Sequence, residues 1–192
     1  MGTIAIGVWN GVEELDLAGP YEVLAAWASA DGVDRRVVTV ATRPDEIRCA
    51  HGLRLVPDTT WDEVGEVEVV VLPGAGTGPL MEDEPFLERL RVLAAGGTLM
   101  TSVCTGALVL AASGLLEGRP ATTHWSALER LAAFDGVEVR PDARYVDSGK
   151  VVTAAGVSAG IDMALHLVAR LDSVERAREV RRYIQYDPEP PV

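Results

Sequence analysis

The chain has 192 residues, of which 48% are apolar, and this suits one folded domain over residues 1–192 with a sizeable core. A net charge of −12 argues against nucleic acid and anionic membranes as partners, because both require a basic surface. Two cysteines and three histidines fit neither a disulfide scaffold nor a zinc motif and indicate a reducing, cytoplasmic compartment. We expect neither a signal peptide nor a membrane span.

Apolar runs typical of buried strands alternate with helical patterns along the chain. The expected strands are 3–9, 35–42, 67–74 and 98–103, followed by short strands within 137–156. We expect a hairpin at 48–58, with His51 and Gly52 at its tip. The expected helices begin at Pro20 and Thr105, cover 84–97, 123–134 and 158–171, and end with one from about Asp172.

This alternation predicts an α/β fold, in which a doubly wound, mostly parallel sheet carries helices on both faces. Asp172 stands three residues before Glu175, a spacing typical of a capping box at the start of the last helix. The final segment, "YDPEPPV", contains three prolines and is not expected to be helical.

One thiol stands where a strand pattern gives way to a helix pattern, in "TSVCTGALVLAASGLL". Cys104 has small residues two positions before and two after it, Ser102 and Gly106, as in a nucleophile elbow. We expect the start of the following helix to lower the pKa of the thiol. The alternative is that Cys104 is a core residue at a tight turn.

A nucleophile needs a partner that handles protons, and Asp16 is the candidate. It stands in "ELDLAGP", which we expect to be a loop between the first strand and the helix that begins at Pro20. If the first and fourth strands are near neighbours, Asp16 faces Cys104 and its pKa is raised, as a general acid requires. From spacing alone, a role in capping or solvating the loop is the stronger interpretation.

The segment "PGAGTGPL" follows the third strand and is rich in glycine. Lys and Ser or Thr do not follow in the order of a phosphate-binding P-loop, so we reject that interpretation. The backbone amides of Gly74 and Ala75 suit an oxyanion hole near the thiol instead.

Histidines and a further thiol supply other candidates. His124, followed by Trp125, either forms a dyad with Cys104 or starts a helix and bonds backbone, and both interpretations stay open. Val157 lies in a small-residue helix start and is a candidate wall of the site, although ordinary packing explains it as well. We interpret Cys49 as structural and His51 and His166 as a turn residue and a helix-surface residue.

The segments "VCTGALVLAASGLLEGRPATTHW", "ELDLAGPYEVL", "VLPGAG", "LMED", "GVSAGIDMAL" and "IQYDPEPP" together resemble the ThiJ/PfpI superfamily. The resemblance covers nearly the whole chain. Its nearest branches are the isocyanide (isonitrile) hydratases and the ThiJ/PfpI-type domain of AraC-family regulators. It implies a flavodoxin-like, class I glutamine-amidotransferase-like fold, a homodimer and a small-molecule substrate, with no metal or organic cofactor.

The resemblance also implies roles for individual residues. Cys104 matches the nucleophile, Asp16 its acidic partner and Thr105 the residue that follows the nucleophile in the hydratases. Gly74 and Ala75 match a glycine pair whose amides face the thiol; the second glycine is alanine here, and the loop before "LMED" is one residue shorter. The protease-like branch has His where Thr105 stands, which argues against peptidase activity.

The function expected from these residues is hydration of an isocyanide to an N-substituted formamide through a thioimidate on Cys104. One alternative is a ligand-sensing domain related to the regulators, and the chain carries no basic helix-turn-helix segment after "YDPEPP". Glyoxalase- or deglycase-like activity and thiol redox sensing are further alternatives, and those branches prefer Glu at the position of Asp16.

Overall fold

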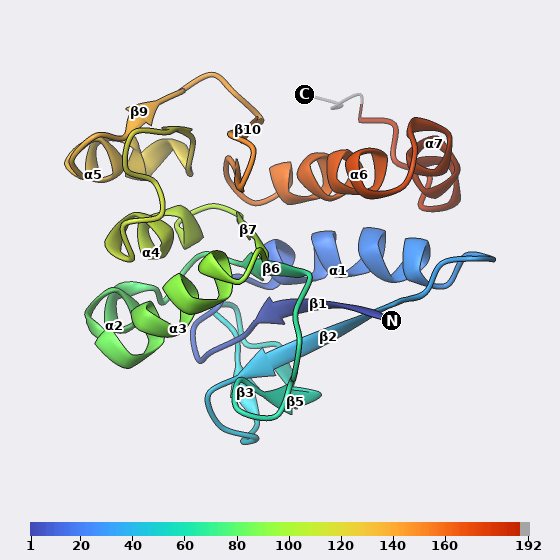
Figure 1. Cartoon of the computed structure of the whole chain (residues 1–192), viewed down its shortest axis with the longest axis horizontal. Helices are drawn as coiled ribbons and strands as arrows, with labels where there is room; N and C mark the ends of the chain where they lie inside the picture. The colour runs from blue at the N-terminus through green and yellow to red at the C-terminus, as the bar shows by residue number, and fades with distance from the viewer. Residues whose placement is uncertain (189–192) are drawn as a thin grey trace.

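The computed structural model describes residues 1–188, and its centre is a sheet of seven strands (Figure 1). The strand order is β10-β11-β7-β6-β1-β2-β5, and neighbouring strands are parallel except β10, which runs antiparallel to β11. The predicted mostly parallel sheet is therefore confirmed. The strands are β1 (Gly2–Gly7), β2 (Arg35–Ala41), β5 (Thr59–Thr60), β6 (Val69–Leu72), β7 (Leu99–Ser102), β10 (Tyr145–Asp147) and β11 (Val151–Ala154).

Helices cover both faces of this sheet (Figure 1). Side chains alternate along β1, so Ile4 and Ile6 pack into one core cluster and Ala5 into the other. Within residues 1–188, no helix has the length and apolar character of a membrane span. One face carries α1 (Glu14–Ala28), α6 (Ala159–Leu171) and α7 (Val174–Tyr183); the other carries α2 (Gly78–Glu82), α3 (Glu84–Ala95), α4 (Gly106–Ala112) and α5 (Leu128–Ala132).

The strand order brings the predicted functional segments to one edge of the sheet. β6 lies between β1 and β7, so the first and fourth predicted strands are near neighbours, as expected. The loops after these three parallel strands therefore leave the sheet side by side. The turn after β11 joins them, because β11 pairs with β7.

The first helix begins six residues before the predicted start. α1 starts at Glu14, and Pro20 lies inside it. Proline has no backbone N–H, so the carbonyl of Asp16 lacks its usual partner four residues later, and the helix tolerates this loss. The sequence pattern therefore placed the start of α1 wrongly, and Asp16 lies in the first turn of a helix instead of a loop.

Most other differences between the predicted and the observed elements concern short helices and strands. The predicted 48–58 hairpin is present as β3 (Ile47–Arg48) paired with β4 (Arg54–Leu55). The helix expected over 123–134 is a 3-10 turn, Trp125–Ala127, followed by α5. β8 (Pro120–Ala121), which pairs with β9 (Glu138–Val139), and the elements α2 and β5 were not predicted, because they are too short to show a period.

The C-terminal helix is capped by a different residue from the one predicted. Ser173 accepts a hydrogen bond from the Arg176 backbone N–H at 3.1 Å. Asp172 instead accepts the indole N–H of Trp27 at 2.9 Å, which ties α7 to α1. Residues 186–188 are not helical, as expected for the proline-rich segment, and residues 189–192 lie outside the described part of the chain.

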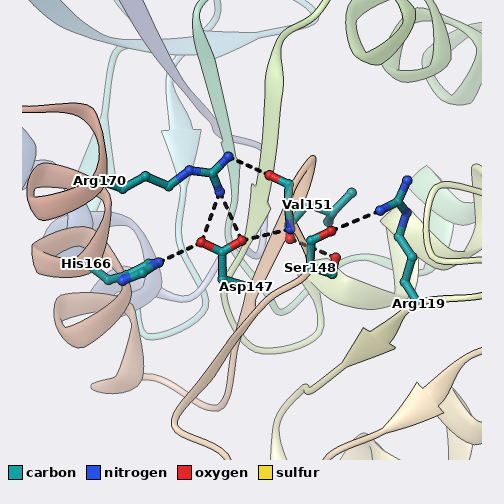
Figure 2. Close-up of polar contacts among 7 residues, drawn as sticks. Arg119, Asp147, Ser148, Val151, His166 and Arg170 are labelled. Carbon is teal, nitrogen blue, oxygen red and sulfur yellow. Dashed lines mark hydrogen bonds and ion pairs between the residues drawn. The ribbon is translucent and has the colours of Figure 1, made fainter.

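The β10–β11 hairpin is tied to α6 by a charged cluster (Figure 2). Asp147 accepts hydrogen bonds from Nη1 of Arg170, at 3.0 Å to each carboxylate oxygen, and its Oδ2 lies 2.7 Å from Nε2 of His166. Burial alone raises the pKa of Asp147, but the hydrogen bond from His166 and the charge of Arg170 outweigh burial and lower it. His166 is thus a helix-surface residue, as predicted, that also anchors the hairpin.

The start of α4 lies directly against the end of β6. A Cβ on Gly106 would lie 2.0 Å from the carbonyl oxygen of Leu72 and 2.7 Å from that of Pro73. Both obstacles are backbone atoms, so neither moves without displacing the strand. The close approach explains why the residue two positions after Cys104 has no side chain.

We predict that Gly106→Ala lowers the free energy of unfolding by about 3 kcal/mol or more, because the added methyl group overlaps backbone. Gly78→Ala is the matched control, since a Cβ there meets nothing within 4 Å and the change stays within about 0.5 kcal/mol. Urea denaturation measures both. Equal stability of the two variants would contradict the close approach of α4 to β6.

Candidate active site

Cys104 occupies a sharp turn between β7 and α4. Its φ is +56°, in the left-handed region that non-glycine residues rarely adopt. The Cys104 N–H donates to the carbonyls of Ala154 and Ala155 at 3.2 and 2.9 Å, and Thr123 Oγ1 donates to the Cys104 carbonyl at 2.6 Å. These bonds hold the strained residue in place, and the predicted nucleophile-elbow geometry is present.

The carboxyl group of Asp16 lies next to this thiol. Its Oδ2 accepts the backbone N–H of Gly74 at 2.8 Å. A Cβ on Gly74 would lie 2.8 Å from both Asp16 Oδ2 and Cys104 Cβ, so the two side chains converge on the same glycine. Asp16 is 0% exposed and Cys104 8% exposed, so both residues of the pair are buried.

Burial sets the pKa of both groups. Burial raises the pKa of Asp16 to about 6, although hydrogen bonds from Gly74, Cys104 and Val157 oppose this. This rise confirms the direction expected for Asp16. Burial also raises the pKa of the Cys104 thiol to about 12, with the Asp16 charge adding to the rise.

The expectation of a lowered thiol pKa is therefore wrong. The backbone N–H groups of Thr105 and Val157 do lower the pKa of Cys104, but loss of hydration and the neighbouring carboxylate outweigh them. At neutral pH the resting pair consists of a protonated thiol and an ionised carboxylate. The proton that sequence analysis assigned to Asp16 thus lies on the sulfur beside it.

The backbone amides of the loop after β6 already donate hydrogen bonds within the protein. Gly74 N–H donates to Asp16, and Ala75 N–H donates to Thr105 Oγ1 at 2.9 Å. Neither is free to bind an oxyanion in this structure, contrary to the prediction. Ala75 has a φ of +58°, and the indole N–H of Trp9 donates to its carbonyl at 2.8 Å. Thr105 and Trp9 therefore fix this loop against the elbow.

The turn after β11 completes the site. Val157, with a φ of +47°, directs its backbone N–H toward the thiol and the carboxyl group and lowers the pKa of both. Gly156 lies against the ring of His124, where a Cβ would be only 2.2 Å from His124 Cδ2. Val157 therefore lies beside Cys104 and Asp16, and its role as a wall of the site stays a prediction.

His124 has the geometry of a helix-start residue. Its Nδ1 lies 2.7 Å from Ser126 Oγ and accepts the Ser126 N–H at 3.3 Å. In residues 1–188, none of its hydrogen bonds joins Cys104, so the structure favours backbone capping over a Cys–His dyad. The Trp125 ring packs against His124 in a tilted arrangement, with ring centroids 5.3 Å apart, and Trp125 is 77% exposed.

The described residues contain one cluster with the spacing of possible metal ligands, formed by Glu13, Glu14 and His51. Each of them offers a ligand atom within 4.8 Å of the others. Internal hydrogen bonds explain the cluster without an ion. Glu14 accepts the backbone N–H groups of His51 and Leu53 at 2.7 and 3.3 Å, which anchors the β3–β4 hairpin to α1. Cys49, at the base of this hairpin, is buried, consistent with its structural interpretation.

Sequence analysis missed Thr123 and Trp9, which hold the Cys104 carbonyl and the Ala75 carbonyl. Thr123 directly precedes the singled-out His124, and Trp9 follows the first strand at the functional edge. Their positions offered a weak signal, but the bonds to backbone carbonyls depend on contacts across 19 and 66 residues of chain.

The raised pKa of Asp16 predicts a pH-dependent stability. The folded-state pKa lies above the usual value, so the contribution of Asp16 is most favourable below about pH 4 and is lost as pH rises through about 6. Asp16→Asn removes this dependence. From pH 4 to pH 7, urea denaturation should show the variant gaining about 2 kcal/mol relative to the parent. A constant difference between the two proteins would contradict the assignment.

Comparison with known proteins agrees with this fold. A model of the DJ-1/PfpI family matches residues 2–170. Isonitrile hydratase of Pseudomonas putida is 42% identical over 181 residues, which are 94% of this chain and 76% of that protein. The HTH-type transcriptional regulator CdhR of Pseudomonas aeruginosa is 36% identical over 184 residues, which are 93% of this chain but about half (51%) of the regulator.

A solved structure shows the same architecture. The crystal structure of a ThiJ/PfpI family protein from Pseudomonas syringae superimposes with a TM-score of 0.90 at 33% identity, covering 100% of this chain and 77% of that one. The family model spans nearly the whole chain, including the segments that hold Asp16, Gly74, Cys104 and Val157. The chain belongs to the DJ-1/PfpI family.

Proposed function

We propose that this protein hydrates isonitriles to N-substituted formamides, with Cys104 as the nucleophile and Asp16 as the group that moves protons. The observation that carries the proposal is the convergence of the buried Asp16 carboxyl group and the Cys104 side chain on Gly74. The 42% identity to isonitrile hydratase supports the substrate class. Cys104 is part of a hydrophobic core cluster, which suits an uncharged substrate.

The first step adds the thiol across the terminal carbon of the isonitrile, R–N≡C. Asp16 takes the thiol proton as the sulfur–carbon bond forms, and the same carboxyl group then delivers that proton to the carbon. The product of this step is a thioimidate, R–N=CH–S–Cys104. No oxyanion forms, so the step does not require the amides of Gly74 and Ala75, which are bonded to Asp16 and Thr105.

The second step is hydrolysis of the thioimidate. Asp16, ionised again, removes a proton from water as the water oxygen attacks the same carbon, and the carboxyl group passes that proton to the substrate nitrogen, which gives R–NH–CH(OH)–S–Cys104. Collapse of this adduct breaks the carbon–sulfur bond, returns a proton to the Cys104 sulfur and releases R–NH–CHO. The net reaction consumes one isonitrile and one water, with no oxidant or reductant.

Thr105 holds the loop after β6 in place during these steps. Its hydroxyl accepts the Ala75 N–H, and its own backbone N–H faces the sulfur and lowers the pKa of the thiol. We assign Trp125 and His124 to the substrate-facing surface, because the segment that carries them is bonded to the Cys104 carbonyl through Thr123. Val157 supplies a wall on the opposite side of the elbow.

We predict that Cys104→Ala abolishes hydration of benzyl isonitrile and that Asp16→Asn lowers kcat by at least about 100-fold, because each change removes a reacting group. Formation of N-benzylformamide, followed by liquid chromatography, measures both. Cys49→Ala is the matched control: it makes the same exchange at a buried cysteine outside the site and should retain parental activity. Parental turnover by Cys104→Ala would exclude the mechanism.

The proposed first step also predicts a pH profile. Asp16 must be ionised to accept the thiol proton, so kcat/KM should rise with pH and level off above the Asp16 pKa of about 6. Because the Glu13 charge raises this pKa, Glu13→Gln should move the inflection to lower pH. Glu22→Gln, an exposed change on α1, should leave it in place. An activity that falls between pH 5 and 7 would contradict the role of Asp16 as a base.

Ligand sensing is the second candidate, favoured by the 36% identity to the regulator CdhR over most of this chain. A sensor binds its ligand without consuming it. Calorimetric binding of benzyl isonitrile with no formamide formed over hours would support sensing instead of catalysis.

A further inference from the structure

Val157 adopts a backbone conformation that needs support. Its φ of +47° is unusual for a β-branched residue, and such residues persist only where surrounding contacts hold them. The preceding residues, Ala154 and Ala155, accept the Cys104 N–H through their carbonyls. The turn that carries the Val157 amide is therefore directly attached to the elbow, and whatever holds the turn controls the placement of that amide.

Arg144 bonds to both sides of this turn. Its backbone carbonyl accepts the Ala155 N–H at 2.9 Å, before Val157. Its guanidinium donates to Ser158 Oγ at 3.3 Å and, through Nε, to Asp162 Oδ2 at 2.9 Å, after Val157. A single residue thus spans the turn and fixes it to the first turn of α6.

Tyr186 occupies the other oxygen of Asp162. At the end of α7, the N–H groups of Gln185 and Tyr186 donate to the carbonyls of Arg182 and Arg181 at 3.2 and 3.1 Å, with Gln185 at a φ of +50°. This Schellman arrangement reverses the chain after the helix. It brings the Tyr186 hydroxyl to Asp162 Oδ1, to which it donates at 3.1 Å.

We propose that Arg144, Asp162 and Tyr186 form a positioning unit that holds the Val157 amide against the Cys104–Asp16 pair. The three residues act through the turn at 155–158 and make no contact of their own with the reacting atoms in the hydrogen bonds of residues 1–188. The proposal concerns the site to which we assign hydratase activity. Its test uses the thiol itself, so it stands or fails separately from the substrate assignment.

Several groups face the thiol and must be separated from the effect of Arg144. The charged ones are Asp16, whose charge acts on the thiol, and Glu13, whose charge acts on Asp16. The uncharged ones are the backbone N–H groups of Thr105 and Val157, while the Gly74 N–H donates to Asp16. Because Arg144 is itself cationic, a charge-preserving variant is needed to distinguish position from electrostatics.

The experiment measures the rate at which iodoacetamide alkylates Cys104 between pH 5 and 10, followed by peptide mass spectrometry. Cys49, read in the same samples, reports any general loosening of the fold. We expect Arg144→Gln to slow Cys104 alkylation about threefold to fivefold at fixed pH and to move the Asp16 inflection upward, because loss of the Val157 amide disfavours both anions. Arg144→Lys keeps the charge but cannot bond Ser158 and Asp162 as a fork, and it should behave like Arg144→Gln.

A more conservative variant distinguishes the proposed effect from misfolding. Tyr186→Phe removes one hydroxyl and should shift Cys104 in the same direction by a smaller factor, whereas Tyr183→Phe, at an exposed tyrosine three residues earlier, should match the parent. An unchanged Cys104 profile in Arg144→Gln and Tyr186→Phe would overturn the proposal. So would parental behaviour of Arg144→Lys, which would show a charge effect, or equal acceleration at Cys49 and Cys104, which would show a stability effect.

Discussion

The convergence of a buried carboxyl group and a buried thiol on Gly74 is the constraint on which the rest of this site depends. Asp16 and Cys104 come from α1 and from the end of β7, and they meet only because β6 lies between β1 and β7. Burial disfavours the ionised form of both groups, so the pair keeps one proton at neutral pH and places it on the sulfur. One proton on the sulfur beside an ionised carboxylate is the state that the proposed addition of S–H across carbon requires.

The surrounding backbone is arranged to hold this pair at a cost in conformational energy. Ala75, Cys104 and Val157 all have positive φ, and each lies in a different loop at the same edge of the sheet. Residues that hydrogen-bond to the neighbouring backbone offset the strain: Trp9 and Thr105 for the loop after β6, Thr123 for the elbow, and Arg144 for the turn after β11. Strained residues that cluster at one edge of a sheet, each held by hydrogen bonds from neighbouring residues, are typical of a functional site.

Much of the fold and part of the site were predictable from local sequence patterns. The strand–helix alternation, the hairpin at 48–58 and the small residues around Cys104 follow from periodicity and steric rules that operate within a few residues. The start of α1 was not predictable in this way, because Pro20 is a common first helical residue and nothing nearby shows that it lies inside the helix. The prediction of a lowered thiol pKa failed for a related reason. The helix start that supplies the amides can be predicted from the sequence, whereas the burial that outweighs them results from tertiary packing.

The protonation state of the resting site tests this account most directly. Thiolate absorbs near 240 nm, and the difference in absorbance between the parent and Cys104→Ala isolates the contribution of one sulfur. With burial raising the thiol pKa to about 12, the difference should be negligible from pH 5 to pH 9. A thiolate signal that titrates in below pH 8 would contradict the shared-proton pair at the centre of the proposed mechanism.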